Sequence, residues 1–387
     1  MLLKITKIHK KQYKDALRLS SYAFQYDYSE RELEKKIKSY EDQDLYGIFD
    51  GDQLAAKLHI RPFHIWLEQQ QVKMGGISSV ATYPEYRRKG YVRELLIHSL
   101  SEMRRNGQTV SFLHPFSIPF YRKFGWEVFS EFLTLSLTKA DLIRQPQQNG
   151  YIKRFSRDSN IEDLKTIYPQ FADKFIGMMT RDRIWWKENV IQKSQVAIYY
   201  DQHHTPLGYM LYDISKKEME IREFVPLNHE ARIGLWNFIC QHDSMVNKVE
   251  MYTYVSDPLP FTLFNPDIKT ERKTFGMARI VDVKEFCEIY PFQWSDQSSV
   301  TFQIVDEHAP WNTGTYTLNK DMGLSFSPEL RQNTGLSFTI NHFTALLLGF
   351  KTAQQLSDAG AIKGSKSEME ALQSILLQKE PSLFDGF

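Results

Sequence analysis

The chain has 387 residues, which corresponds to about two or three domains of ordinary size. Hydrophobic residues make up 42% and charged residues 25% of the chain, a balance that is typical of folded proteins and argues against disorder as the main state. The 48 basic residues nearly equal the 47 acidic residues, and a net charge of +1 argues against a dedicated nucleic-acid binder, which carries a basic excess.

The cysteines and the N-terminus indicate the compartment. Cys240 and Cys287 lie too far apart for a Cys-x-x-Cys metal pair and do not form a disulfide framework. The N-terminal stretch lacks the apolar segment of a signal peptide. The longest apolar run, around 346–350, is far shorter than the ~20 residues that cross a bilayer. We therefore expect a cytoplasmic protein without a membrane span, whose mature form is the whole chain.

The first part of the chain mixes strands with helices. Alternating apolar residues or short apolar runs predict strands over 2–8, 45–49, 54–67, 72–81, 109–114 and 128–137. Helical spacing predicts helices over 13–24, 29–37, 88–105 and 117–124. Ser29 with Glu32 is a capping box. Asp50-Gly51 is a hairpin signal between two of the strands.

A polar linker at 144–150 precedes a second run of the same elements. Strands are predicted over 151–155, 195–200, 206–214, 219–225 and 248–255, and helices over 159–175, 180–192 and 228–242. The order repeats that of the first part, which indicates a duplicated domain. The turn at 226–230 has neither the glycine nor the basic cluster found at the corresponding place in the first copy.

A third section follows near residue 280. Helices are predicted over 281–290, 351–360 and 367–377, strands over 299–306, 314–318 and 324–326, and a strand followed by a helix over 337–348. The predicted domains are therefore 1–148, 149–280 and 281–387.

One turn in the first domain has the chemistry of an anion site. The strand that ends in Val80-Ala81-Thr82 leads into Arg87-Arg88-Lys89-Gly90-Tyr91-Val92-Arg93, where a helix opens. Free backbone N–H groups at a helix start favour anions, and a glycine lets the chain approach a phosphate closely. Three cations complete a cradle for a pyrophosphate. A solvated basic helix start is the alternative interpretation of this turn.

A second motif begins at Phe116, shortly after the strand that is predicted over 109–114. Phe116-Ser117-Ile118-Pro119-Phe120-Tyr121-Arg122-Lys123-Phe124-Gly125-Trp126 contains the pattern Phe-Tyr-x-x-Phe-Gly-aromatic. Together, the two motifs resemble those of the GNAT acetyltransferases. The resemblance implies that the turn and the preceding strand hold acetyl-CoA, and that Tyr121 lies near the thioester sulfur. The implied cofactor-binding residues are Val80, Ala81, Thr82, Arg87, Arg88, Lys89, Gly90, Tyr91, Val92, Arg93, Phe116 and Ser117.

The whole chain resembles the Eis-type (enhanced intracellular survival) N-acetyltransferases. The resemblance implies an α/β (α+β) fold with tandem GNAT domains around mixed central sheets, of which the second is degenerate, and a C-terminal sterol-carrier-protein-like α+β domain. It also implies a homo-oligomer. Acetyl-CoA is the expected co-substrate, and no metal is expected, since the His203-His204 pair falls in a predicted solvated hairpin turn.

The implied reaction transfers acetyl to a primary amine of a small polycationic or lysine-type acceptor. Backbone N–H groups of 80–82 would polarise the thioester carbonyl, and Tyr121 would act as the general acid. The family uses its own C-terminal carboxylate as the base, which here belongs to Phe387. The alternatives are a core tyrosine with a satisfied hydroxyl and a frayed chain end.

An acceptor pocket is predicted where aromatic side chains lie between the first two helices, with a carboxylate to attract a cation. The aromatic candidates are Tyr22, Phe24, Tyr26 and Tyr28, and the acidic candidates are Asp27 and Glu30. Packing of the two helices accounts for these residues equally well. The alternative function is a lipid- or acyl-binding protein whose GNAT domain senses CoA without turnover.

Overall fold

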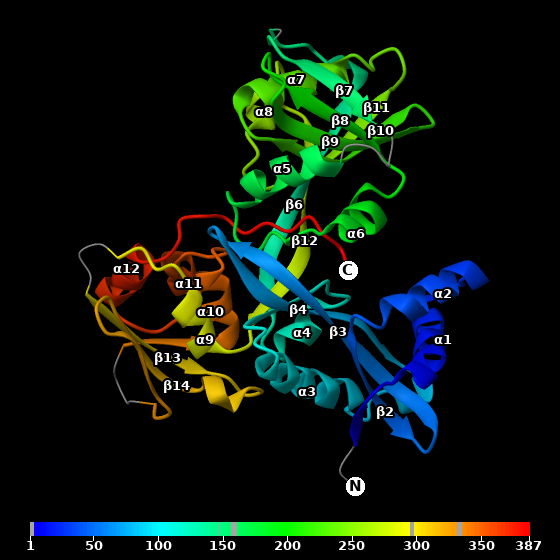
Figure 1. Cartoon of the computed structure of the whole chain (residues 1–387). Helices are drawn as coiled ribbons and strands as arrows, with labels where there is room; N and C mark the ends of the chain where they lie inside the picture. The colour runs from blue at the N-terminus through cyan, green and yellow to red at the C-terminus, as the bar shows by residue number, and fades with distance from the viewer. Residues whose placement is uncertain (1–3, 147, 156–160, 295–297, 331–334) are drawn as a thin grey trace.

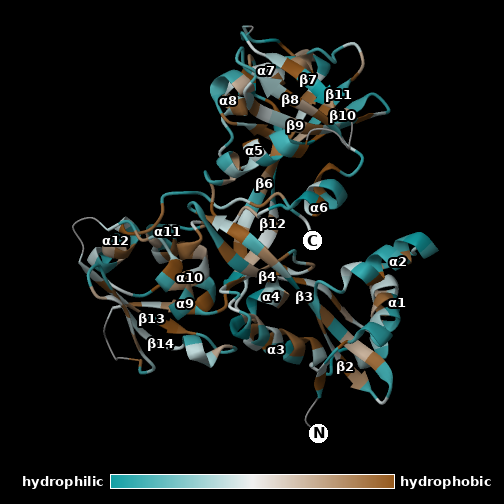
Figure 2. Ribbon diagram, in the orientation of Figure 1, coloured by the Kyte–Doolittle hydropathy of each residue, from teal (hydrophilic) through white to brown (hydrophobic). Residues whose placement is uncertain are grey.

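The computed structural model describes residues 4–146, 148–155, 161–294, 298–330 and 335–387, which form three lobes in chain order (Figure 1). The lobes share part of their interior. One contiguous cluster of buried hydrophobic residues includes Phe112 of the first lobe, Phe171 of the second and Phe302 of the third. Figure 2 shows hydrophobic residues in the strands and inner helices of each lobe. No described helix is long and apolar enough to span a bilayer.

The elements predicted for the first lobe are present, with shifts at their ends. The capping box at Ser29 forms, since the Glu32 N–H donates to Ser29 Oγ and the Ser29 N–H donates to the Glu32 carboxylate. The elements are β1 (Ile5–Lys7), η1 (Lys10–Gln12), α1 (Tyr13–Phe24), α2 (Glu30–Ser39), β2 (Asp44–Asp50), β3 (Gln53–Leu67), β4 (Gln70–Thr82), η2 (Pro84–Tyr86), α3 (Tyr91–Arg105), β5 (Val110–Leu113), α4 (Ile118–Arg122), β6 (Glu127–Thr138) and η3 (Lys139–Asp141).

The helix predicted from residue 88 begins later, at Tyr91. Arg88 has φ of 64° and Gly90 has φ of 80°, and a right-handed helix cannot include these left-handed conformations. The basic cluster therefore forms a turn in front of α3 rather than its first residues.

The second lobe repeats the plan of the first. Its elements are β7 (Tyr151–Phe155), α5 (Ile161–Ala172), α6 (Arg183–Trp185), η4 (Trp186–Ile191), β8 (Gln195–Tyr200), β9 (Pro206–Ser215), β10 (Glu218–Pro226), α7 (His229–Cys240), β11 (Lys248–Thr253), α8 (Leu259–Thr262) and β12 (Lys269–Ile280). The single helix predicted over 180–192 is instead the short α6 followed by the wide π-turn η4. The consecutive Trp185 and Trp186 are both buried there. Residues 159 and 160 of the helix predicted over 159–175 lie outside the described residues.

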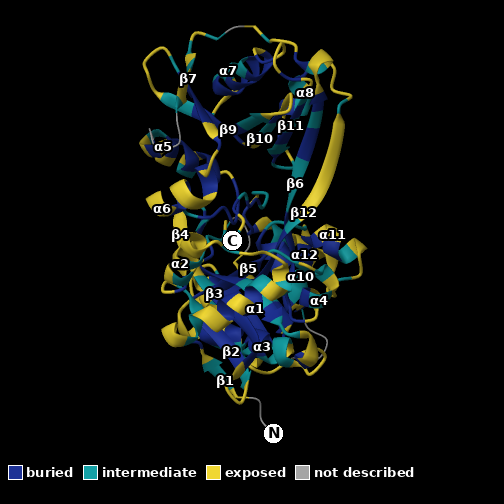
Figure 3. Cartoon of the chain, turned by 90° about the vertical axis from the view of Figure 1, so that its right-hand side faces the viewer, coloured by how far each residue is buried: buried dark blue, intermediate teal, exposed yellow. Residues whose placement is uncertain are grey.

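The strand β12 was not predicted, and it joins the two halves of the protein. Twelve described strands form one sheet in the order β1-β2-β3-β4-β5-β12-β6-β11-β10-β9-β8-β7. β6 comes from the first half but pairs with β11, whereas β12 comes from the second half and pairs with both β5 and β6. Figure 3 shows β6 and β12 side by side between the lobes. The halves thus exchange strands, and their separation would break backbone hydrogen bonds.

The third lobe packs on this junction. Its elements are α9 (Val283–Ile289), β13 (Ser299–Val305), η5 (Pro310–Asn312), β14 (Gly314–Asn319), β15 (Gly323–Ser327), β16 (Leu336–Thr339), α10 (Ile340–Leu347), α11 (Ala353–Asp358) and α12 (Lys366–Ser374). Its described strands form a sheet in the order β15-β14-β13-β16. Arg279 of β12 is fully buried and forms an ion pair with Asp306, with an Nη2–Oδ2 distance of 2.6 Å, which links this lobe to the shared sheet.

The last residues of the chain leave the third lobe and run between the other two (Figure 1). The Ile176 N–H donates to the Glu380 carbonyl at 3.0 Å, and the Ser382 N–H donates to the Ile176 carbonyl at 3.0 Å. Ser382, Leu383 and Asp385 are buried. The tail is therefore held between the lobes up to Asp385, and the partly buried Phe387 follows it.

Candidate active site

β4 and β5 form a gap that exposes backbone groups. Their parallel pairing ends at Ile77 and Leu113, whereas β4 continues to Thr82. A β-bulge lies in this stretch, since Ser79 has φ of 51° and the register with β3 skips from Ser78 to Ala81. The backbone of β4 beyond Ile77 therefore has no partner on its β5 side and is available to a ligand.

The turn in front of α3 fits the phosphates of acetyl-CoA. Arg87, Arg88 and Lys89 are exposed, and no described acidic side chain lies within ion-pair distance of them. Lys89 lies 4.8 Å from the centre of the Tyr86 ring. A Cβ placed on Gly90 would meet nothing within 4 Å, so the glycine serves the left-handed turn and leaves the approach open.

The other predicted cofactor residues flank this region. Tyr91 and Val92 are half-buried in the first turn of α3, Arg93 is exposed, and Ser117 is the N-cap residue of α4. The Thr82 hydroxyl is buried without a partner among the described residues. An unpaired polar group beside the open strand is consistent with a ligand along β4.

A cavity of about 340 Å³ brings several of the predicted residues together. It is lined by Phe24, Tyr26, Tyr28, Lys36, Ser39, Tyr40, Gln43, His59, Arg61, Ile77, Ser78, Ser79, Val80, His114, Phe116, Tyr121 and Phe387. Val80, Phe116, Tyr121 and Phe387 were predicted as site residues. The remaining predicted cofactor residues do not line the cavity.

Tyr121 is held rigidly at one side of this cavity. Its side chain is buried, and its ring packs against those of Phe116 and Phe120, with centroid distances of 5.4 and 5.2 Å. Burial raises the pKa of Tyr121 to about 12, so the phenol is protonated at neutral pH. The hydroxyl makes no hydrogen bond to any residue that the structure describes, which leaves it available to a ligand.

Phe387 also lines the cavity. Its ring lies 5.0 Å from that of Phe63 and 4.9 Å from that of His114. A Cβ on Gly76 would lie 2.8 Å from Phe387 Cε2, so the ring approaches β4 only because residue 76 is glycine. These contacts fix the residue that carries the terminal carboxylate.

A buried ion pair anchors the tail that carries Phe387. Arg181 of the second lobe and Asp385 have side chains that are each 1% exposed, with an Nε–Oδ1 distance of 2.9 Å. Trp185 Nε1 donates to the same carboxylate at 2.7 Å, and Arg181 also pairs with Glu223. Burial opposes the charge of Arg181, but Asp385 and Glu223 outweigh it and raise the pKa of Arg181, so its guanidinium stays charged.

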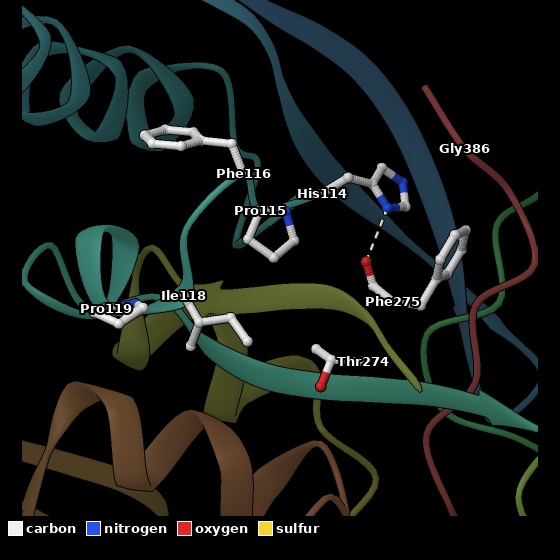
Figure 4. A pocket seen from close by; sticks show the side chains of 8 residues that line it. All are labelled: His114, Pro115, Phe116, Ile118, Pro119, Thr274, Phe275 and Gly386. Carbon is white, nitrogen blue, oxygen red and sulfur yellow. Dashed lines mark hydrogen bonds between the residues drawn. The ribbon is translucent and has the colours of Figure 1, made fainter. Parts of the chain in front are cut away.

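His114 was not predicted, although it follows directly on the buried strand β5. Its Nδ1 lies 3.0 Å from the Phe275 carbonyl and its Nε2 lies 3.2 Å from the Asp385 carbonyl, so the ring connects β12 to the tail. Burial lowers the pKa of His114. Figure 4 shows a neighbouring cavity of about 450 Å³, which is lined by His114 and Phe116 as well as by Gly386. The two cavities therefore adjoin at the chain end.

Three basic residues on one face of β3 were also missed. Lys57, His59 and Arg61 alternate with apolar residues, and this spacing of two was the available signal. The fully buried Lys57 Nζ lies 2.9 Å from His59 Nε2 and donates to the Ser79 carbonyl at 3.1 Å. Lys57 thus holds the bulge of β4 in place. Burial lowers the pKa of Lys57 to about 7.

The predicted acceptor pocket is only partly present. Phe24, Tyr26 and Tyr28 line the cavity, as expected. Tyr22 instead packs against Tyr83, with a centroid distance of 5.5 Å, and neither of the predicted acidic residues, Asp27 and Glu30, lines the cavity.

Comparisons with known proteins agree with this architecture. Residues 4–129 and 177–280 each match a protein-family model described as an acetyltransferase (GNAT) domain, and residues 283–384 match one described as a sterol carrier protein domain. The chain is a GNAT N-acetyltransferase with two such domains and a C-terminal sterol carrier protein domain. Its predicted fold class is confirmed, and so is the prediction of an enzyme. GNAT domains imply acetyl-CoA as the co-substrate and an amine as the acceptor.

Similar proteins extend over most of this GNAT chain. An "Uncharacterized N-acetyltransferase" of Streptomyces griseus is 22% identical over 329 residues, which are 76% of this chain and 77% of that one. The "N-acetyltransferase Eis" of Mycobacterium tuberculosis is 22% identical over 52% of each chain. A solved structure from Enterococcus faecalis, titled a probable N-acyltransferase, is 28% identical over 99% of both chains, with a TM-score of 0.92. Eis1 of Mycobacterium abscessus shares the fold, with a TM-score of 0.82 at 18% identity over 99% of this chain and 100% of that one.

The buried Lys57 predicts a specific dependence of stability on pH. Its pKa is about 7 in the folded chain and near the ordinary 10.4 when unfolded, so the unfolded state binds more protons between these values. The stability of the wild type relative to Lys57→Met should therefore rise from pH 7 to pH 10, by at most ~1.4 kcal/mol per pH unit. Thermal unfolding of both proteins across this range measures it. Lys73→Met, at an exposed position, should show no such trend. A Lys57→Met difference that is constant with pH would contradict the assignment.

The anchor predicts that Asp385→Asn impairs turnover without impairing cofactor binding. The variant leaves the buried Arg181 with one carboxylate fewer and should displace the chain end. Misplacement of a reacting group by about 1 Å lowers a reaction rate by on the order of 100-fold. We expect kcat to fall at least about tenfold, with the acetyl-CoA dissociation constant nearly unchanged. Asp257→Asn, which breaks the buried Arg232–Asp257 pair and leaves all contacts of Asp385 in place, is the control. Full activity of Asp385→Asn would show that the anchor does not position the site.

Proposed function

We propose that this acetyltransferase modifies a primary amine of a small molecule, with Tyr121 as the general acid and the terminal carboxylate of Phe387 as the base. The supporting observation is that Tyr121, Phe387 and the bulge of β4 line one cavity. A volume of about 340 Å³ suits a small acceptor.

The proposed division of labour follows the three sections 1–148, 149–280 and 281–387. Only the first has the gap beside β4 together with the basic turn before α3. We propose that acetyl-CoA binds there, held by Val80, Ala81, Thr82, Arg87, Arg88, Lys89, Gly90, Tyr91, Val92, Arg93, Phe116 and Ser117. The second section supplies Arg181, and the third supplies the tail with Phe387. A homo-oligomeric state and a cytoplasmic location stay predictions.

Acetyl-CoA supplies an acyl group on a thiol leaving group. The Phe387 carboxylate attracts the acceptor amine and takes its proton as the N–C bond forms. An ordinary α-carboxyl pKa near 3.5 makes it a weak base, so proton transfer must accompany bond formation. The positive side chains around the cavity help, because like charges disfavour the ammonium form of the amine.

Tyr121 acts at the departing sulfur. As the C–S bond breaks, the phenol donates its hydrogen bond and then its proton to the sulfur, and solvent restores that proton. The pKa of Tyr121, about 12, lies above the ~8.5 of an ordinary thiol, so the proton moves only in concert with departure. Backbone N–H groups of the β4 bulge stabilise the charge that develops on the carbonyl oxygen.

Of the two predicted acceptor types, the lining of the cavity favours the lysine type. A polycation needs carboxylates, and among the described residues no Asp or Glu side chain lines the cavity. Release of thiol from acetyl-CoA across a panel of primary amines, with the native chain end, tests the function. The proposal predicts release with at least one amine, and release with none would contradict it.

Tyr121→Phe tests the acid directly. Removal of the hydroxyl should lower kcat by about 100-fold, the ordinary contribution of general acid catalysis, while acetyl-CoA binding is retained because the ring packing is unchanged. Steady-state kinetics and calorimetric titration measure the two quantities. Tyr22→Phe, at an exposed position outside the cavity, should behave as the wild type. A kcat of Tyr121→Phe within twofold of the wild type would remove this residue from the mechanism.

A further inference from the structure

The wall of the proposed acceptor cavity is basic. Lys36 of α2, His59 and Arg61 of β3, and His114 line it. Burial lowers the pKa of His59 and of His114, so the positive charge of the wall comes from Lys36 and Arg61. In the part of the chain that the structure describes, no acidic side chain lines the cavity. This composition is the reverse of what a polycationic acceptor requires.

Arg61 is half-buried and has no anionic partner. Its guanidinium carbon lies 5.1 Å from the ring centre of Phe63 and 5.2 Å from that of Trp185, which fixes its direction. No described carboxylate, that of Phe387 included, lies within 4.0 Å of its nitrogen atoms. Burial lowers the pKa of Arg61 to about 10. A partly desolvated cation without a carboxylate is costly, and a bound anion would offset that cost.

Lys36 adds a second cation at the same place. Its side chain lines the cavity, and the surrounding protein and the charge of Arg61 lower its pKa. It forms no ion pair with a described residue. By contrast, the preceding Lys35 pairs with Glu188 at 3.6 Å and does not line the cavity. Lys36 and Arg61 therefore line the cavity without an anionic partner among the described residues, whereas Lys35 is paired outside it.

The cations and the chain end share one wall. The ring of Phe63 contacts both groups, since its centre lies 5.1 Å from the guanidinium carbon of Arg61 and 5.0 Å from the ring centre of Phe387. A small molecule that fills the cavity can therefore face Phe387 with one end and Arg61 with the other. Its first end must be the amine that reacts, and its second end should be negative.

Building on the proposed function, we propose that the acceptor is a small primary amine that also carries an anionic oxygen group, a carboxylate or a phosphate. Arg61 and Lys36 bind the anionic group, and the amine faces the Phe387 carboxylate. A guanidinium offers paired N–H donors that match either anion. The same wall repels polyamines that lack an anionic group.

Matched acceptors test this proposal. Lysine and cadaverine carry the same amine arm and differ by the carboxylate, and phosphoethanolamine and ethanolamine differ by the phosphate. With saturating acetyl-CoA, kcat/KM should favour the anionic member of at least one pair by more than about tenfold, the ordinary effect of a charge-assisted hydrogen bond. The pair that shows the preference identifies the anion.

Variants locate the preference. Arg61→Gln and Lys36→Gln should each reduce the preference for the anionic amine about tenfold, with little change in the kcat/KM of ethanolamine or in the KM of acetyl-CoA. Lys35→Gln is the matched control and should leave the preference unchanged. Since Lys36 lies on an exposed helix, its variant remains informative if Arg61→Gln folds poorly.

Binding separates this proposal from the proposed function. Calorimetric titration of each acceptor into the CoA-loaded, non-reacting enzyme should show the same preference without turnover. Absence of thiol release together with preferential binding of the anionic amine would contradict the proposed function and support the acceptor class. Equal or tighter binding of cadaverine and ethanolamine, or an Arg61→Gln variant that changes only the KM of acetyl-CoA, would overturn the acceptor class.

Discussion

The Arg181–Asp385 ion pair is the interaction on which the proposed site depends. It connects the second lobe with the tail of the third across 204 residues of sequence, and both side chains are almost fully buried. Burial of such a pair is costly unless hydrogen bonds complete it, and here Glu223 and Trp185 do so. The pair holds Asp385, whose carbonyl contacts His114, two residues before the chain end. A reacting carboxylate at a chain terminus needs this restraint, because termini otherwise fray.

The exchange of β6 and β12 provides the frame for that restraint. Since each strand pairs with strands from the other half, the cavity-lining strands β3 and β4 belong to the same continuous sheet as β10, whose Glu223 pairs with Arg181. The buried Arg279–Asp306 pair connects the third lobe to the same junction. The lobe that carries the tail, the lobe that anchors it and the lobe that receives it are thereby fixed relative to one another. This arrangement gives the second GNAT domain a structural task.

The parts of the site that are local in sequence could be predicted, and the parts that depend on distant contacts could not. The turn at Arg87–Gly90 and the aromatic motif around Tyr121 each lie within a few residues, so pattern and resemblance were sufficient to select them, and their roles stay predictions. The Arg181–Asp385 pair has no local signal. The strand β12 was missed because its first half, Lys269 to Thr274, is exposed and polar and shows no hydrophobic alternation. The basic residues of β3 had a signal in their spacing of two, but the strand was predicted from the apolar residues that alternate with them.

The proposed role of the Phe387 α-carboxylate in the reaction can be tested by changing that group alone. Semisynthesis that ends the chain in a Phe387 carboxamide keeps the ring, its contacts with Phe63 and His114, and the anchor at Asp385. With the best acceptor amine, the amide should lower kcat by about 100-fold while acetyl-CoA binding and the melting temperature stay unchanged. An amide enzyme with the kcat of the native protein would show that the terminal carboxylate is not the base.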